Sequence, residues 1–147
     1  MTKHLDGAEL ASKINKSFPD AVIEWNHEEI WIAPENLIMI SKWLKTTDNL
    51  DFGSLRAITA VDYIEYFELI YHLLSMRLNQ SAILKTRIFG RKEPVVDSVV
   101  EIWKGADSQE REIWDLMGIR FEGHPNLKRV LLWEGFPGHP LRKDFIR

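Results

Sequence analysis

The chain has 147 residues, of which 45% are hydrophobic and 28% are charged, and a formal net charge of −3; these values are typical of one soluble globular domain. The sequence has no cysteine, which excludes disulfides, thiolate metal sites and the usual iron–sulfur clusters. No apolar run reaches the about 18–20 residues of a membrane span, and the N-terminus lacks the apolar region of a secretory signal.

The first third of the chain predicts two helices on either side of a β-hairpin. A capping box at Asp6–Glu9 starts the first helix, and Pro19 ends it. The runs 21–25 and 30–33 are rich in β-formers and flank a polar turn, as in a hairpin. Pro34 then opens a second helix, whose apolar positions have helical spacing: Leu37, Ile40, Trp43 and Leu44.

Residues 55–89 are apolar enough for either a buried helix or strands. Their β-branched and aromatic side chains favour strands, with a turn near 63–66. A third strand is expected at 81–89, after the turn at Asn79-Gln80, because apolar residues alternate there.

Two further capping boxes, Ser98–Glu101 and Asp107–Glu110, predict short helices at 98–103 and 108–117, and Gly118 is expected to end the second. The residues after Gly118 include three prolines and are predicted to form an irregular segment, with one helical turn at 127–131 after Asn126. We therefore expect an α+β fold: a small, mainly antiparallel or mixed sheet packed with helices over residues 1–118, followed by an extended tail at 119–147. Residues 1–118 should fold without this tail.

The predicted helix at 108–117 is unusually charged. Arg111 and Asp115 have the spacing of a salt bridge on a solvated helix face. A paired-carboxylate catalytic site is the alternative, drawn from Glu110, Glu112 and Asp115, but only Glu112 and Asp115 have helical spacing and no nucleophile lies nearby.

The triplet Gly-His-Pro occurs twice, at 123–125 and 138–140. Proline keeps the preceding histidine extended, and glycine permits a sharp bend. Zinc normally requires three or four protein ligands, whereas His124 and His139 have no local third ligand. We interpret both histidines as structural or interface residues rather than as metal ligands or catalytic bases; a histidine-based metal hydrolase remains the alternative.

The tail is basic, whereas the rest of the chain is acidic. Residues 120–147 contain six Lys or Arg and three Asp or Glu, against thirteen and nineteen in residues 1–119. Its large apolar side chains cannot be buried by regular structure within the tail itself, so they indicate a partner surface. We expect a protein partner and no nucleic acid, with Arg142 facing partner carboxylates and Phe145 filling a pocket.

The stretch "EREIWDLMGIRFEGHPNLKRVLL" together with "GHPLRKDF" resembles the signature of the thirty-kilodalton subunit (the C subunit) of proton-pumping NADH–quinone oxidoreductase, respiratory complex I. The upstream stretch from about residue 50 also resembles this family. The signature positions that we expect at subunit interfaces are Glu110, Arg111, Glu112, Asp115, Gly118, Phe121, Gly123, His124, Pro125, Arg129, Gly138, His139, Pro140, Leu141, Arg142, Lys143, Asp144 and Phe145.

The resemblance implies an α+β subunit of the hydrophilic arm with no catalytic, cofactor or metal site of its own. NADH, flavin, iron–sulfur clusters and quinone would belong to the host complex. The implied partners are the quinone-site subunit and the terminal-cluster subunit, on the cytoplasmic side of the cell membrane. Departures at Leu116-Met117, Asn126 and Phe136-Pro137 leave the type of complex open: an energy-converting hydrogenase, a reductase with another electron donor and a non-respiratory assembly are alternatives.

Overall fold

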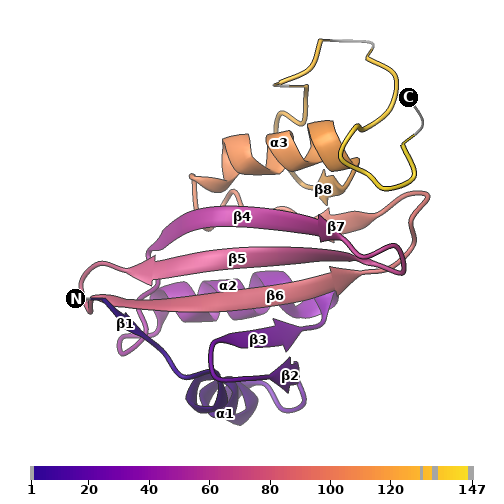
Figure 1. Cartoon of the computed structure of the whole chain (residues 1–147). Coiled ribbons are helices and arrows are strands. Elements are labelled where there is room, and N and C mark those ends of the chain that lie inside the picture. The colour runs from indigo at the N-terminus through magenta and orange to yellow at the C-terminus, as the bar shows by residue number, and fades with distance from the viewer. Residues whose placement is uncertain (1, 130, 134–135, 146–147) are drawn as a thin grey trace.

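The structure is a computed structural model that describes residues 2–129, 131–133 and 136–145 (Figure 1). Its helices are α1 (Gly7–Ser17), the short 3-10 helix η1 (Pro34–Asn36), α2 (Leu37–Thr46) and α3 (Ala106–Met117). Its strands are β1 (Lys3–His4), β2 (Val22–Trp25), β3 (Glu29–Ile32), β4 (Ser54–Asp62), β5 (Phe67–Ser75), β6 (Gln80–Ile88), β7 (Val95–Asp97) and β8 (Arg120–Glu122).

The main sheet is mixed, and its strand order is β2-β3-β6-β5-β4. The pairs β2–β3, β4–β5 and β5–β6 are antiparallel, whereas β3 and the short β1 run parallel to β6. The strands β7 and β8 form a separate parallel pair. These findings confirm the predicted α+β class, the hairpin and the three strands within residues 54–88.

One apolar core joins the sheet to the helices. The helix α2 lies behind β5 and β6, and α3 lies along β4 (Figure 1). Alternate residues of β5 point into this core, so that Phe67, Leu69 and Tyr71 are fully buried, as the two-residue period of a strand requires. The edge of β4 is covered by α3, because the Ile58 N–H donates to Gln109 Oε1 at 2.6 Å.

The two last helix predictions need correction. The helix predicted at 98–103 is a single turn, in which the N–H groups of Ile102 and Trp103 share the Val99 carbonyl. The prediction was wrong because the Ser98 hydroxyl and the Val99 N–H bind Glu110 of α3 instead. The second helix begins at Ala106, before its predicted cap Asp107, and ends as predicted at Gly118, which has a φ of 76°.

Residues 119–122 belong structurally to the body of the protein. Ile119 is fully buried and Phe121 is 2% exposed, and β8 pairs with β7 from Arg120 to Glu122. Dividing the chain at residue 118 stays a prediction, but these contacts lead us to expect the boundary after Glu122. We call residues 2–122 the body and the described residues beyond Glu122 the C-terminal segment.

Candidate functional site

The helix α3 places the acidic signature residues in different environments. Glu110 and Asp115 are fully buried, whereas Glu112 is exposed. We predicted that Asp115 lies on a solvated helix face, and this prediction was wrong. Its carboxylate is buried and binds Arg129 at 2.8 Å. Glu112 and Asp115 do not share one environment, which disfavours the paired-carboxylate site. Arg111 Nε is buried and has no hydrogen-bond partner among the described residues.

Glu110 links α3 to the turn at 98–103. Its carboxylate accepts the Ser98 hydroxyl at 2.5 Å and the Val99 N–H at 2.9 Å. Burial raises the pKa of Glu110, while these two hydrogen bonds oppose the increase. This carboxyl group therefore fixes the turn at 98–103 against α3.

The first Gly-His-Pro begins the C-terminal segment with a structural histidine. Gly123 has a φ of 86°, as expected for a bend. The side chain of His124 is fully buried; its Nδ1 accepts the Asn126 N–H at 3.0 Å, and its Nε2 lies 3.1 Å from the Asp107 carbonyl. This pattern corresponds to the neutral tautomer that carries its proton on Nε2. Pro125 is exposed.

Asp115 is the first anchor of the C-terminal segment. Its Oδ1 binds Arg129, and its Oδ2 accepts the N–H groups of Leu131 and Leu132 at 2.7 and 2.9 Å. The other nitrogen of the guanidinium, Arg129 Nη2, donates to the carbonyls of Phe136 and Gly138 at 2.9 and 3.0 Å. Arg129 therefore connects an early part of the segment to a later part of the same segment. The helical turn predicted at 127–131 is absent at the described residues 127–129, and Val130 lies outside the described residues.

The second Gly-His-Pro also holds a structural histidine. His139 Nδ1 donates to the Asp115 carbonyl at 2.9 Å, and its ring packs against Trp114 with 5.0 Å between centroids. A Cβ atom on Gly118 would lie 2.7 Å from the His139 ring. Glycine is therefore required at position 118 for two reasons: the left-handed backbone at the end of α3 and the close approach of the His139 ring. Pro140 is half-buried after it.

Asp62, at the end of β4, is the second anchor. Its side chain is 2% exposed and binds both terminal nitrogens of Arg91, at 2.6 and 2.8 Å. It also accepts the backbone N–H of Ile64 and that of Lys143, each at 2.8 Å. The hydrogen bonds from Arg91 hold the pKa of Asp62 well below its usual range, and those from Lys143 and Ile64 act in the same direction.

Charged signature residues extend this anchor. Asp144 binds Arg91 at 3.1 Å and Arg142 at 2.9 Å, and these contacts lower the pKa of Asp144, with Arg142 as the largest cause. Arg142 also donates to the Arg91 carbonyl at 2.6 Å. The two guanidinium groups lie 4.8 and 5.1 Å from the centroid of Phe67, as in cation–π contacts. Arg142 thus has partners within its own chain, and its predicted contact with a partner carboxylate stays a prediction.

Asp62 and Arg91 were not predicted from the sequence as site residues. A signal was present at Asp62, which follows the apolar run of β4 at an inward-facing position. No comparable signal marks Arg91, because it lies in a charged loop between strands.

The C-terminal segment exposes large apolar side chains. Leu131, Trp133 and Leu141 are 59%, 64% and 60% exposed. The Trp133 ring packs edge-on against Phe136 at 5.8 Å, and Phe136 stacks on Phe145 at 6.4 Å. This surface, which we call the aromatic row (Trp133, Phe136 and Phe145), is suited to contact with another protein.

The described residues offer no metal centre and no membrane span. No group of three or more His, Asp or Glu residues lies close enough among them to hold a metal ion. Within the same residues, no helix is long and apolar enough to cross a membrane.

Two solved structures share this fold. A chain of the membrane-bound sulfane sulfur reductase (MBS), an archaeal respiratory membrane complex, matches with a TM-score of 0.77 and 27% identity, over 95% of this chain and 85% of that one. The trypsin-resistant fragment (1-134) of Nqo5 matches with a TM-score of 0.56 and 25% identity, over 82% of this chain and 97% of the fragment.

The sequence comparisons agree with this likeness. The C subunit of NADH-quinone oxidoreductase from Ruegeria sp. (strain TM1040) is 41% identical over 93% of this chain and 71% of that protein. The protein of the same name from Roseiflexus sp. (strain RS-1) is 35% identical over 95% of this chain and 84% of its own length. Residues 30–147 match the family described as the respiratory-chain NADH dehydrogenase, 30 Kd subunit. The predicted resemblance is confirmed: the chain belongs to the family of the 30 Kd subunit of respiratory-chain NADH dehydrogenase, complex I.

Proposed function

We propose that this chain is a cofactor-free subunit of an NADH–quinone oxidoreductase, in which it supports the quinone-reducing module. The family match over residues 30–147 carries this proposal. The site is consistent with it, because the buried signature residues Glu110, Asp115 and His124 bind other parts of the chain. We assign them no role in electron or proton transfer.

The C-terminal segment is the proposed attachment to neighbouring subunits. Asp115 and Asp62 hold it on the body, while Leu131, Trp133 and Leu141 are exposed. A surface whose backbone is already held loses less conformational entropy when it binds. The proposed partners are the quinone-site and terminal-cluster subunits, on the cytoplasmic side of the cell membrane.

A second candidate is the equivalent subunit of a complex with a different electron donor. It is favoured by the TM-score of 0.77 with the sulfane sulfur reductase chain, against 0.56 for the Nqo5 fragment. The relatives at about 40% identity carry the name NADH-quinone oxidoreductase, and we therefore prefer the first candidate.

Purification of the tagged chain from detergent-solubilised membranes of its own cells tests the proposal. We expect flavin and iron–sulfur subunits to co-purify and the preparation to reduce quinone with NADH. Recovery with subunits of a different donor module would support the second candidate, and recovery of the chain alone would contradict both. A stoichiometric flavin, haem or cluster in the isolated chain would contradict its cofactor-free role.

A further inference from the structure

Ile64, in the turn between β4 and β5, has a strained backbone. Its φ is 73°, in the left-handed region that glycine and asparagine adopt but that a β-branched residue seldom does. Its side chain is exposed, so packing in the core does not hold it there. A conformation of this kind costs free energy and persists only where surrounding contacts fix it.

Two hydrogen bonds fix the backbone of Ile64, and both come from the Asp62–Arg91 pair. The Ile64 N–H donates to Asp62 Oδ1 at 2.8 Å, and the Ile64 carbonyl accepts Arg91 Nη1 at 2.9 Å. The N–H and the carbonyl lie on opposite sides of the φ and ψ torsions of Ile64. Both hydrogen bonds can therefore form only while these torsions are kept.

The same pair binds the C-terminal segment with its other atoms. Asp62 Oδ2 accepts the Lys143 N–H at 2.8 Å, and Arg91 Nη2 donates to Asp144 at 3.1 Å. The Arg91 carbonyl also accepts Arg142 Nη2 at 2.6 Å. In each of the two side chains, one terminal atom binds the hairpin turn and the other binds the segment.

The geometry of the Asp62–Arg91 pair links its two sides. The carboxylate and the guanidinium are both planar, and two hydrogen bonds of 2.6 and 2.8 Å join them in a bidentate arrangement. A rotation of either group that breaks its contact on one side also displaces the atom that serves the other side. The two sets of contacts are therefore not independent.

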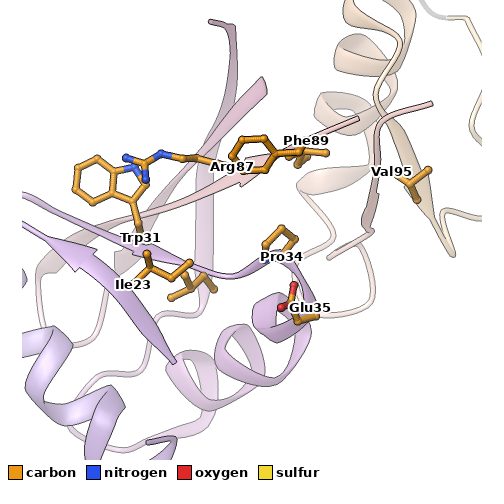
Figure 2. A pocket seen from close by; sticks show the side chains of 9 residues that line it. Ile23, Trp31, Pro34, Glu35, Arg87, Phe89 and Val95 are labelled. Atoms are coloured by element: carbon orange, nitrogen blue, oxygen red, sulfur yellow. The ribbon is translucent and has the colours of Figure 1, made fainter. Parts of the chain in front are cut away.

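The tyrosine rings of the hairpin turn are held in another way. The Tyr63 ring lies 5.3 Å from the Tyr66 ring, which lies 5.4 Å from the Phe89 ring. Phe89 in turn lines a groove of the body together with Arg87 (Figure 2). These ring contacts do not involve the backbone of Ile64. Its relaxation should therefore be a local change that leaves the hairpin folded.

We infer that docking of the C-terminal segment and the left-handed conformation of Ile64 are energetically coupled through the Asp62–Arg91 pair. The docked segment fixes both side chains in the geometry that Ile64 requires, and by thermodynamic linkage the effect is reciprocal. Tyr63 and Ile64 are 46% and 59% exposed, so a molecule that binds the segment also fixes this exposed turn. The inference goes beyond the proposed function, because it concerns the chain by itself.

Amide hydrogen exchange in the full-length chain tests both directions of the coupling. Ile64→Gly and Ile64→Asn relieve the strain, whereas Ile64→Val keeps a β-branched residue and is the matched control. Asp144→Asn weakens the contact between the segment and Arg91, and Asp48→Asn removes the same charge from an exposed position. Exchange is measured at the Ile64 and Lys143 amides and is expressed relative to the intrinsic rate of each sequence.

We expect the two strain-relieving variants to slow exchange of the Lys143 amide by about fivefold, and Ile64→Val to leave it unchanged. Asp144→Asn should accelerate exchange of the Ile64 amide by a similar factor, although Asp144 does not bind Ile64, whereas Asp48→Asn should have no effect there. Protection of the Tyr71 amide in β5 checks that each variant is folded.

The absence of either effect between the two regions would overturn the coupling. Equal effects of Ile64→Gly and Ile64→Val at the Lys143 amide would also overturn it, because the lost side chain rather than the strain would then be the cause. The proposed function would stand in each case, since none of these measurements involves a host complex.

Discussion

The body and the C-terminal segment are held by different kinds of interaction. The body buries a continuous apolar core, in which Leu69, Tyr71 and Phe121 are at most 2% exposed. The segment instead binds through two buried carboxylates, Asp115 and Asp62, which accept backbone N–H groups and arginine side chains. Apolar burial is non-directional, whereas charge-assisted hydrogen bonds fix position and orientation.

This difference indicates how an irregular segment can present apolar groups. If the segment were held by its own apolar side chains, they would be unavailable to a partner. Because Asp115 and Asp62 bind its backbone instead, Trp133 and Leu141 stay more than half exposed. The two carboxylates therefore hold the backbone of the segment in place and leave its apolar side chains available to a partner.

Truncation should have the largest effect on stability. It also tests where the boundary between the body and the C-terminal segment lies. A chain ending at Gly118 loses Ile119 and Phe121 from the core, and removal of a buried Phe side chain alone costs about 3–5 kcal/mol. A chain ending at Glu122 keeps both residues and should retain one cooperative transition. Urea denaturation followed by circular dichroism compares the two. Equal stability of the two truncated chains would contradict a boundary after Glu122.

Asp62→Asn should loosen the C-terminal segment and leave the body folded. The loss of a charged acceptor for Arg91 and for the Lys143 N–H should cost about 1.5–3 kcal/mol of docking free energy. Hydrogen exchange of the Lys143 amide should accelerate, while amides of β5 remain protected. Asp20→Asn removes the same charge from an exposed position and is the control. Unchanged exchange at Lys143 would show that Asp62 is not an anchor.

The same anchor predicts a pH dependence. The pKa of Asp62 is lowered in the folded protein. The contribution of Asp62 to the docking free energy is therefore present above its unfolded pKa of about 3.9, and it is lost as the pH falls through the lower folded value. Docking of the segment should therefore persist at pH 5.

Glu110 should behave in the opposite way. Its folded pKa is raised by burial, so it stabilises the fold most below its unfolded pKa of about 4.3, and this contribution is lost as the pH rises through the folded value. Glu110→Gln cannot ionise and should not lose this stability. The free energy of unfolding of the variant should therefore increase relative to that of the wild type as the pH rises. Glu110→Ala should cost about 1–3 kcal/mol, because the Ser98 hydroxyl and the Val99 N–H lose their acceptor. Chemical denaturation between pH 4 and 8 measures both variants; parallel pH profiles of wild type and Glu110→Gln would refute the raised pKa.

The smallest effect is expected at Tyr71, inside the body. Its hydroxyl is buried and has no hydrogen-bond partner in the described part of the chain. Tyr71→Phe removes this unsatisfied group and keeps the ring, and should raise the free energy of unfolding by about 1 kcal/mol. Tyr63→Phe, at a residue that is 46% exposed, is the control. A loss of stability at position 71 would reveal a buried partner for the hydroxyl.

Local signals predicted the regular elements of the body well. Asp6 caps α1 and accepts the Ala8 N–H, Pro34 opens the helical region of η1 and α2, and Gly118 ends α3. The capping box at Ser98 failed because a group from a distant element, Glu110, supplied the competing hydrogen bonds. Sequence patterns describe neighbours along the chain and cannot show such a competitor.

The candidate site was predicted less completely for the same reason. The two Gly-His-Pro triplets indicated bends with structural histidines, and the left-handed Gly123 and Gly138 confirm the bends. The partners of the signature were not predictable: Asp115 binds Arg129 from the segment, and Asp62 binds Lys143 across 81 positions of the sequence. The family resemblance supplied candidate residues, and the structure shows the contacts that Asp115, His139 and Arg142 make.

The separation between Asp62 and Lys143 also has a consequence for synthesis on the ribosome. The strands β4 and β5 and the loop with Arg91 emerge well before Lys143, and proteins fold from the N-terminus as they are made. The acceptor for the segment is therefore complete before the segment itself exists, and docking is the last step of folding. A chain that stops prematurely before Trp133 would have a folded body without the aromatic row. Such incomplete chains would be stable enough to persist but unable to use this surface, so assembly itself would discriminate against unfinished copies.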